Sequence, residues 1–275
     1  MSHVVDDLDG AVAWYERVFA PRVWQRSELF GTSLALLAVG DVVFMPMEPA
    51  PGSGPGRFRS RFGERLHSLA LYVEGPVELI GRLEGAGLRL TGHRGQPLED
   101  PLDEIWTQPR ETPMVFEFFE PRPSMADPRL EEPDWSTRYW SDEHPLGLQG
   151  AHYTLVTAEE AGAVGFLVDV LGGTVVRRSL VEAYGTRSTF VSLSDAVVVE
   201  VAVPEVGDCA AAEDLAAGGA FHAVTFRVTD LDRALAHLEA NGIRTHRPAP
   251  GHIALDPGDT LGVQLRFTDR AVATW

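Results

Sequence analysis

His152 and Glu200 are the two residues whose types and settings most favour metal chemistry in this sequence. Glu200 lies in the middle of an apolar run at residues 197–203, where a carboxylate is costly to bury unless it is paired or bound to a metal. His152 lies in another predicted strand, and a neutral imidazole is a common metal ligand. The pair therefore predicts a divalent metal site. The alternatives are a core histidine and a Glu200 that faces solvent or pairs with Arg177 or Arg178.

Other predicted strands contain a second set of candidate residues. Glu117 is a carboxylate within an apolar strand, and His67 and His222 each begin a strand. Gln264 and Arg266 are the polar candidates in the last strand. An arginine at a metal site would oppose the cation, so Arg266 could instead neutralise an anionic ligand.

An internal repeat indicates how these residues are positioned. The strand that begins at His67 and the helix-like stretch that continues from Leu83 recur at His222 and Leu238. The offset is the same for both elements, since 222 − 67 = 155 and 238 − 83 = 155. A constant offset over a strand and a helix indicates two copies of one supersecondary unit.

Four copies of this unit are predicted, each with a strand, an amphipathic helix and about three further strands. Asp6 or Asp7 should cap the first helix and Asp230 the last, because carboxylates accept hydrogen bonds from the free N–H groups at a helix start. Left-handed glycines should end three of the helices, at Gly87, Gly172 and Gly242. The units lie near residues 1–48, 65–121, 150–204 and 220–270.

The widest gap between units is rich in proline and charge, as domain boundaries tend to be. It divides the chain into an N-terminal domain at residues 1–121, a linker at 122–148 and a C-terminal domain at 149–275. The linker contains Trp135 and Trp140, so we expect it to pack against one of the domains.

Residues 5–15, 166–172 and 226–232 resemble the helix-entry and helix-exit motifs of the vicinal oxygen chelate superfamily, the glyoxalase/bleomycin-resistance/dioxygenase group. Residues 106–117 and 256–265 resemble the last hairpin of its epimerase-like members. The resemblance implies an α+β fold in which four βαβββ units form two domains with cupped, half-open mixed sheets. It also implies one divalent metal, whose ligands come from the first and last strand of each unit.

Two pairings of the units are compatible with such a metal site. Pairing the second unit with the third gives two histidines and two glutamates, which suits Zn, Ni, Mn or Fe(II), and we favour it. Pairing the third with the fourth is the simpler topology. In both, one histidine lies a single position before the expected slot, which Ser68 or Ala223 occupies, and only a β-bulge would re-aim it. The favoured set is His67, Glu117, His152 and Glu200, and the alternative set is His152, Glu200, His222 and Gln264.

The resemblance supports several functions. The first is a metal-dependent, glyoxalase-like enzyme that acts on a small oxygen-rich metabolite as an isomerase, epimerase or lyase. Glu200 or Glu117 would then move a proton next to a metal-bound carbonyl. The alternatives are a metal-free protein that binds or sequesters a small molecule such as an antibiotic, a dioxygenase, and a degenerate scaffold.

Composition limits the partners. The formal net charge is -17 and the pI is near 4.9, so nucleic acids and anionic membranes are disfavoured. A single cysteine, Cys209, favours a reducing cytoplasm. No apolar run approaches the roughly 18 residues of a spanning helix. A small-molecule ligand is expected, and a homodimer stays open.

Overall fold

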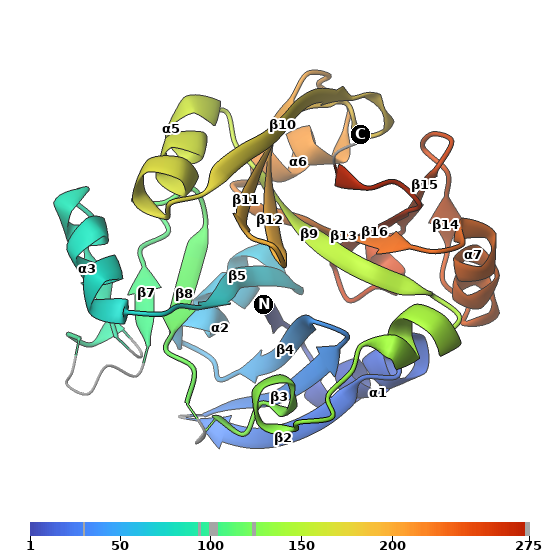
Figure 1. The fold of residues 1–275 in the computed structure, drawn as a ribbon, viewed down its shortest axis with the longest axis horizontal. Helices are drawn as coiled ribbons and strands as arrows, with labels where there is room; N and C mark the ends of the chain where they lie inside the picture. Colours follow the sequence, from blue (N-terminus) through green and yellow to red (C-terminus); the bar gives the residue numbers. More distant parts are fainter. Residues whose placement is uncertain (30, 93–94, 99–103, 123–124, 273–275) are drawn as a thin grey trace.

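The computed structural model describes residues 1–29, 31–92, 95–98, 104–122 and 125–272. The chain forms two eight-stranded mixed sheets, one from each half, which lie side by side (Figure 1). The strand orders are β2-β3-β4-β1-β5-β8-β7-β6 and β10-β11-β12-β9-β13-β16-β15-β14. The two orders have the same pattern, so the predicted α+β fold with repeated units is confirmed.

The first sheet contains the first two units. Its strands are β1 (Ser2–Val4), β2 (Arg22–Leu29), β3 (Thr32–Val39), β4 (Val42–Pro49), β5 (Arg65–Tyr72), β6 (Leu90–Thr91), β7 (Ile105–Thr107) and β8 (Val115–Phe119). The helices of this half are α1 (Leu8–Phe19), α2 (Gly54–Phe62) and α3 (Pro76–Gly85).

The second sheet contains the third and fourth units. Its strands are β9 (Leu148–Val156), β10 (Thr174–Val181), β11 (Thr186–Ser194), β12 (Val197–Pro204), β13 (Phe221–Val228), β14 (Thr245–His246), β15 (His252–Leu255) and β16 (Gln264–Thr268). The helices are α5 (Glu160–Gly165), which continues into a π-helical turn at Phe166–Val170, α6 (Ala210–Ala217) and α7 (Leu231–Ala240).

The favoured pairing of the second unit with the third is wrong. The central contacts are β1 with β5 in the first sheet and β9 with β13 in the second, both antiparallel. The first unit therefore pairs with the second, and the third with the fourth. Units joined by short connections are the ones that pair, at residues 50–64 and 205–220, as is usual for sequential elements. The longer segment at 120–147 separates the two sheets.

Local signals in the sequence set the helix ends. Asp7 accepts a hydrogen bond from the backbone of Gly10 at the start of α1, and Asp230 accepts two at the start of α7. Both predicted caps are confirmed. Gly87, Gly172 and Gly242 have φ between 73° and 80°, the left-handed conformation that ends helices.

A continuous hydrophobic core joins the two halves. Phe19 of α1 packs against Phe226 of β13 with ring centroids 5.5 Å apart. The Trp14 indole donates to the carbonyl of Asp259 at 2.8 Å, and α1 lies beside α7 (Figure 1). The linker joins this core as well: Trp140 is buried and donates to the carbonyl of Phe19 at 3.0 Å. The proposed domain boundaries stay a prediction.

Candidate ligand site in the second sheet

The two faces of the second sheet differ in chemistry. Tyr153 and Leu155 point into the main hydrophobic core. Alternation along a strand sends their neighbours His152 and Thr154 to the opposite face, where both are buried. A polar cluster therefore lies on the face of the sheet that the main core does not cover.

Glu200 of β12 is at the centre of this cluster and has no exposed surface. Its two carboxylate oxygens accept hydrogen bonds from the hydroxyls of Thr154 and Ser188, both at 2.6 Å. His152 Nε2 lies 3.6 Å from Glu200 Oε2. Burial alone would raise the pKa of Glu200, but His152, the Arg266 charge and Ser188 outweigh it and lower this pKa to about 2. Glu200 is therefore ionised near neutral pH.

A β-bulge brings His222 into the same cluster. Phe221 pairs with Leu155 and Ala223 pairs with Thr154, which leaves His222 as the extra residue of β13. His67 is the corresponding extra residue of β5, because Leu66 and Ser68 pair with successive residues of β1. The bulge is thus repeated with the sequence. It resolves the one-residue displacement of both histidines, since a bulge re-aims a side chain.

Arg266 of β16 occupies in the fourth unit the position that Glu200 occupies in the third. Glu200 pairs with Thr154 of β9, and Arg266 pairs with Thr225 of β13. The Arg266 side chain is buried, and its guanidinium carbon lies 3.8 Å above the ring of Tyr184. Its Nη2 donates to His222 Nε2 at 2.7 Å, while its buried Nε has no hydrogen-bond partner among the described residues.

Arg266 and Tyr184 line a cavity of about 570 Å³. Its wall also includes Gln264 of β16 and Cys209 at the start of α6. The Tyr184 hydroxyl lies 3.4 Å from His252 Nδ1, and burial raises the pKa of Tyr184 to about 12. The cavity therefore has a neutral phenol and a guanidinium on one wall. Its volume is in the range of small-molecule sites.

The donor set does not fit a resident divalent ion. Within the described ranges, no group of three or more His, Cys, Asp or Glu side chains is arranged to hold a metal. Zinc sites use at least three protein ligands, whereas His152 and Glu200 provide two. Both ring nitrogens of His222 are already hydrogen-bonded, to Asp214 and Arg266. Arg266 brings a fixed positive charge to the place of the fourth ligand.

The first sheet has the corresponding positions with different residues. Met45 stands where Glu200 stands in the second sheet, and Glu117 stands where Arg266 does. Glu117 is buried and accepts hydrogen bonds from the hydroxyls of Ser2, at 2.8 Å, and Ser68. Burial raises its pKa, against the hydrogen bonds that lower it. His67 packs edge-on against Phe58 of α2, with ring centroids 4.8 Å apart.

The structure therefore separates the favoured ligand set. His67 and Glu117 belong to the first sheet, while His152 and Glu200 belong to the second. The alternative set lies in one sheet, but His222 contacts Arg266 and Asp214, and Gln264 lines two cavities. The catalytic and metal-binding roles of these residues stay predictions.

The sequence did not point to several residues of this region, among them Tyr184 and Asp214. Tyr184 lies in a short 3₁₀ turn between β10 and β11, and Asp214 lies on α6. Helix α6 was not predicted, although its alanine-rich sequence and the left-handed Gly218 at its end are signals for a helix. No comparable pattern marks Tyr184.

The sequence of the second half identifies its family. Residues 150–270 match the family model of the Glyoxalase/Bleomycin resistance protein/Dioxygenase superfamily. This half of the chain belongs to that superfamily. The repeated strand order extends the same fold to the first half, so the predicted tandem arrangement of this fold is confirmed.

A solved structure shares this fold over nearly the whole chain. A triple mutant of 4-hydroxymandelate synthase from Streptomyces coelicolor is 13% identical, with a TM-score of 0.69 over 98% of this chain and 92% of that chain. Methylmalonyl-CoA epimerase from Mycobacterium tuberculosis is 20% identical, with a TM-score of 0.42 over 47% of this chain and 91% of that chain. No curated protein sequence matches this chain. Among the described residues, no helix has both the length and the apolar character needed to cross a membrane.

Proposed function

We propose that this protein binds a small organic anion in the cup of its second sheet, with the Arg266 guanidinium in place of a metal ion. The observation that carries the proposal is the buried Arg266, whose Nε lacks a described partner. A buried donor without an acceptor is unfavourable by roughly 1–3 kcal/mol. A shift of the Arg266 side chain toward the cavity that it lines would let a ligand accept from this donor. A carboxylate fits best, because a guanidinium can bind it through two parallel hydrogen bonds.

The charges of Glu200 and Arg266 interact, but Glu200 does not occupy the hydrogen-bond donors of Arg266. Glu200 already accepts from Thr154 and Ser188, and the hydrogen bond of the Arg266 guanidinium goes to a histidine nitrogen. Ala183 and Ala254 add small apolar side chains to the cavity wall. This wall suits the flat or aliphatic body of a small carboxylate.

A metal-dependent enzyme is the second candidate function. It is favoured by the separation of 3.6 Å between His152 Nε2 and Glu200 Oε2, because the two side chains stand in the positions expected of metal ligands. The lack of a third ligand among the described residues and the charge of Arg266 rank it below the anion site. A reducing cytoplasm and a homodimer stay predictions.

Isothermal titration of the full chain with benzoate tests the anion site. The protein should bind benzoate saturably, and Arg266→Met should weaken binding by about tenfold to a hundredfold, since a charged hydrogen bond contributes roughly 1.5–3 kcal/mol. Arg227→Met is the matched control, because Arg227 lies on the same sheet but is exposed. Equal affinities of the wild type and Arg266→Met would contradict the proposal.

A further inference from the structure

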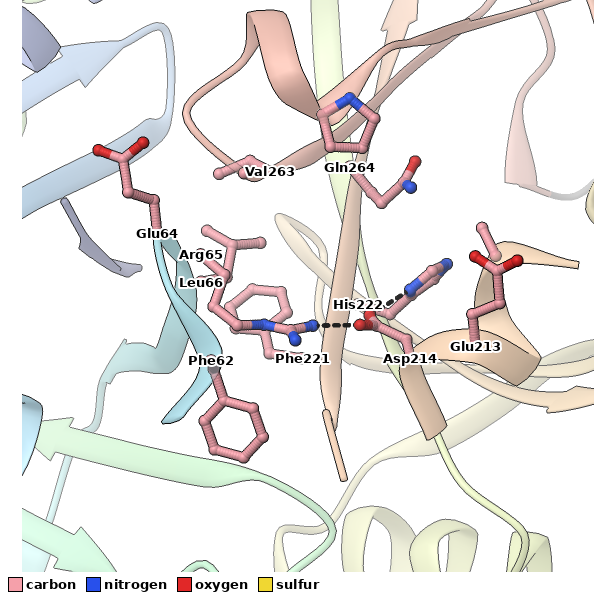
Figure 2. A pocket seen from close by; sticks show the side chains of 13 residues that line it. Phe62, Glu64, Arg65, Leu66, Glu213, Asp214, Phe221, His222, Val263 and Gln264 are labelled. Atoms are coloured by element: carbon pink, nitrogen blue, oxygen red, sulfur yellow. Dashed lines mark hydrogen bonds and ion pairs between the residues drawn. The ribbon is translucent and has the colours of Figure 1, made fainter. Parts of the chain in front are cut away.

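A line of four charged and polar side chains runs from the first sheet to the anion site. Arg65, the first residue of β5, places Nη2 2.5 Å from Oδ1 of Asp214 on α6. The other carboxylate oxygen of Asp214 lies 2.7 Å from His222 Nδ1. His222 Nε2 then meets Arg266 Nη2 at 2.7 Å. Figure 2 shows the first two of these contacts across a cavity of about 230 Å³ between the two halves.

The two partners of His222, Arg266 and Asp214, determine which ring nitrogen of the histidine carries the proton. A guanidinium has donors only, so His222 Nε2 must accept from Arg266. The proton of the neutral ring is therefore on Nδ1, from which it is donated to Asp214. Burial alone would raise the pKa of Asp214, but His222 and Arg65 lower it, so an ionised acceptor faces Nδ1. Burial lowers the pKa of His222, which favours the neutral ring.

These side chains are largely withdrawn from water. The side chains of Arg65, Asp214 and His222 are 14%, 17% and 1% exposed. Hydrogen bonds between ionised groups are stronger at such sites than in solvent. A long arginine side chain loses much rotamer freedom when it is fixed. A site that holds Arg266 before the ligand arrives avoids that loss on binding.

We propose that Arg65, Asp214 and His222 form a hydrogen-bonded relay of positioning residues, which together hold the Arg266 guanidinium above Tyr184 in a geometry ready for an anion. This inference rests on the proposed anion site. It makes the site in the second half dependent on the first half, because Arg65 belongs to β5. None of the three residues needs to touch the ligand.

The tautomer of His222 can be tested without any ligand. In the full wild-type chain, imidazole nitrogen NMR shifts should show Nδ1 protonated and Nε2 unprotonated near neutral pH. Asp214→Asn should shift this equilibrium toward the other tautomer, since the charged acceptor is gone. A wild-type His222 with its proton on Nε2 would overturn the relay, because Arg266 could then not donate to it.

Benzoate titration tests the effect of the relay on the site. Asp214→Asn, Arg65→Met and His222→Ala should each weaken binding by about threefold to tenfold, the range expected for the loss of one hydrogen bond. His222→Gln should restore most of the affinity relative to His222→Ala, because the Gln side-chain oxygen can accept from Arg266. Glu213→Gln is the matched control: it removes an acidic charge from α6, next to Asp214, and should change affinity less than twofold.

The two proposals fail in different ways. If the wild type binds benzoate through Arg266 but Asp214→Asn and His222→Ala bind equally well, the relay is wrong and the anion site stands. If the wild type does not bind benzoate while His222 has the expected tautomer, the proposed function is wrong and the hydrogen-bonded line is structural only.

Discussion

At the residue scale, the buried Glu200 is the feature that sequence reasoning located best. A carboxylate in an apolar strand is stable only with polar partners. Glu200 accepts hydrogen bonds from Thr154 and Ser188 and lies close to His152. The two hydroxyl donors could not be predicted, because they come from β9 and β11 and depend on the strand register. From the sequence, the neutralisation of an anionic ligand by Arg266 was only one alternative. The sequence could not favour it, because the neighbouring Tyr184 lies in a short turn that no pattern marks.

Replacing Glu200 by Gln should change how stability depends on pH. The folded pKa of Glu200, about 2, lies below the ~4.3 of an unfolded glutamate. Its ionised form therefore stabilises the fold above the unfolded value, and this contribution is lost as the pH falls toward the folded value. Wild type should lose about 3 kcal/mol more than Glu200→Gln across this window. Urea unfolding at stepped pH measures it.

Glu213→Gln provides the control for that experiment, because Glu213 is exposed on α6. It should keep the wild-type dependence on pH. If Glu200→Gln loses stability with the same slope as the wild type, the carboxylate is not selectively stabilised in its ionised form.

At the element scale, the sequence repeat predicted the order of strands and helices, and the helix caps followed from it. The repeat could not show the bulges at His67 and His222, because a bulge is a property of the pairing between two strands. It also could not reveal α2 and α6, which lie between units. Asp214 lies on α6, so the repeat could not predict its contact with His222.

Helix α1 departs from the glycine pattern of the other units. Its C-terminal cap is Ala20, with φ 44° and ψ 57°, whereas Gly87, Gly172 and Gly242 have this left-handed conformation elsewhere. Because a left-handed alanine is strained, Ala20→Gly should raise the free energy of unfolding by about 0.5–1 kcal/mol after the entropy of the unfolded chain is included. Chemical denaturation measures the change.

A second glycine substitution serves as the reference. Ala236 is exposed in the middle of α7, where Ala236→Gly should lower the free energy of unfolding by about 1 kcal/mol. If both substitutions destabilise the protein equally, the conformation at Ala20 is not strained.

At the scale of the whole molecule, the two sheets share one core although each has the same internal plan. Phe116 of the first sheet contacts Phe166 next to α5 with ring centroids 5.3 Å apart. The sequence placed these two residues in separate predicted domains, at 1–121 and 149–275. It could not show that the cores merge, since that depends on how the helices of the two halves meet. The same limit explains the wrong preference for pairing the second and third units.

The shared core predicts that the chain unfolds as one unit. Thermal transitions followed by far-ultraviolet circular dichroism and by tryptophan fluorescence should coincide, because neither half keeps its buried surface without the other. The six tryptophans include Trp14 and Trp140, which donate to carbonyls far away in the chain. Two separated transitions, one for each sheet, would contradict this prediction.

The metal content of the untagged, purified protein tests most directly whether Arg266 takes the place of a metal ion. Elemental analysis should find no divalent transition metal in stoichiometric amount, because the cluster offers His152 and Glu200 as ligands beside a fixed guanidinium. The double variant His152→Ala with Glu200→Ala should have the same content as the wild type. About one zinc, nickel, manganese or iron per chain, lost in the double variant, would contradict the account and support a metal-dependent enzyme.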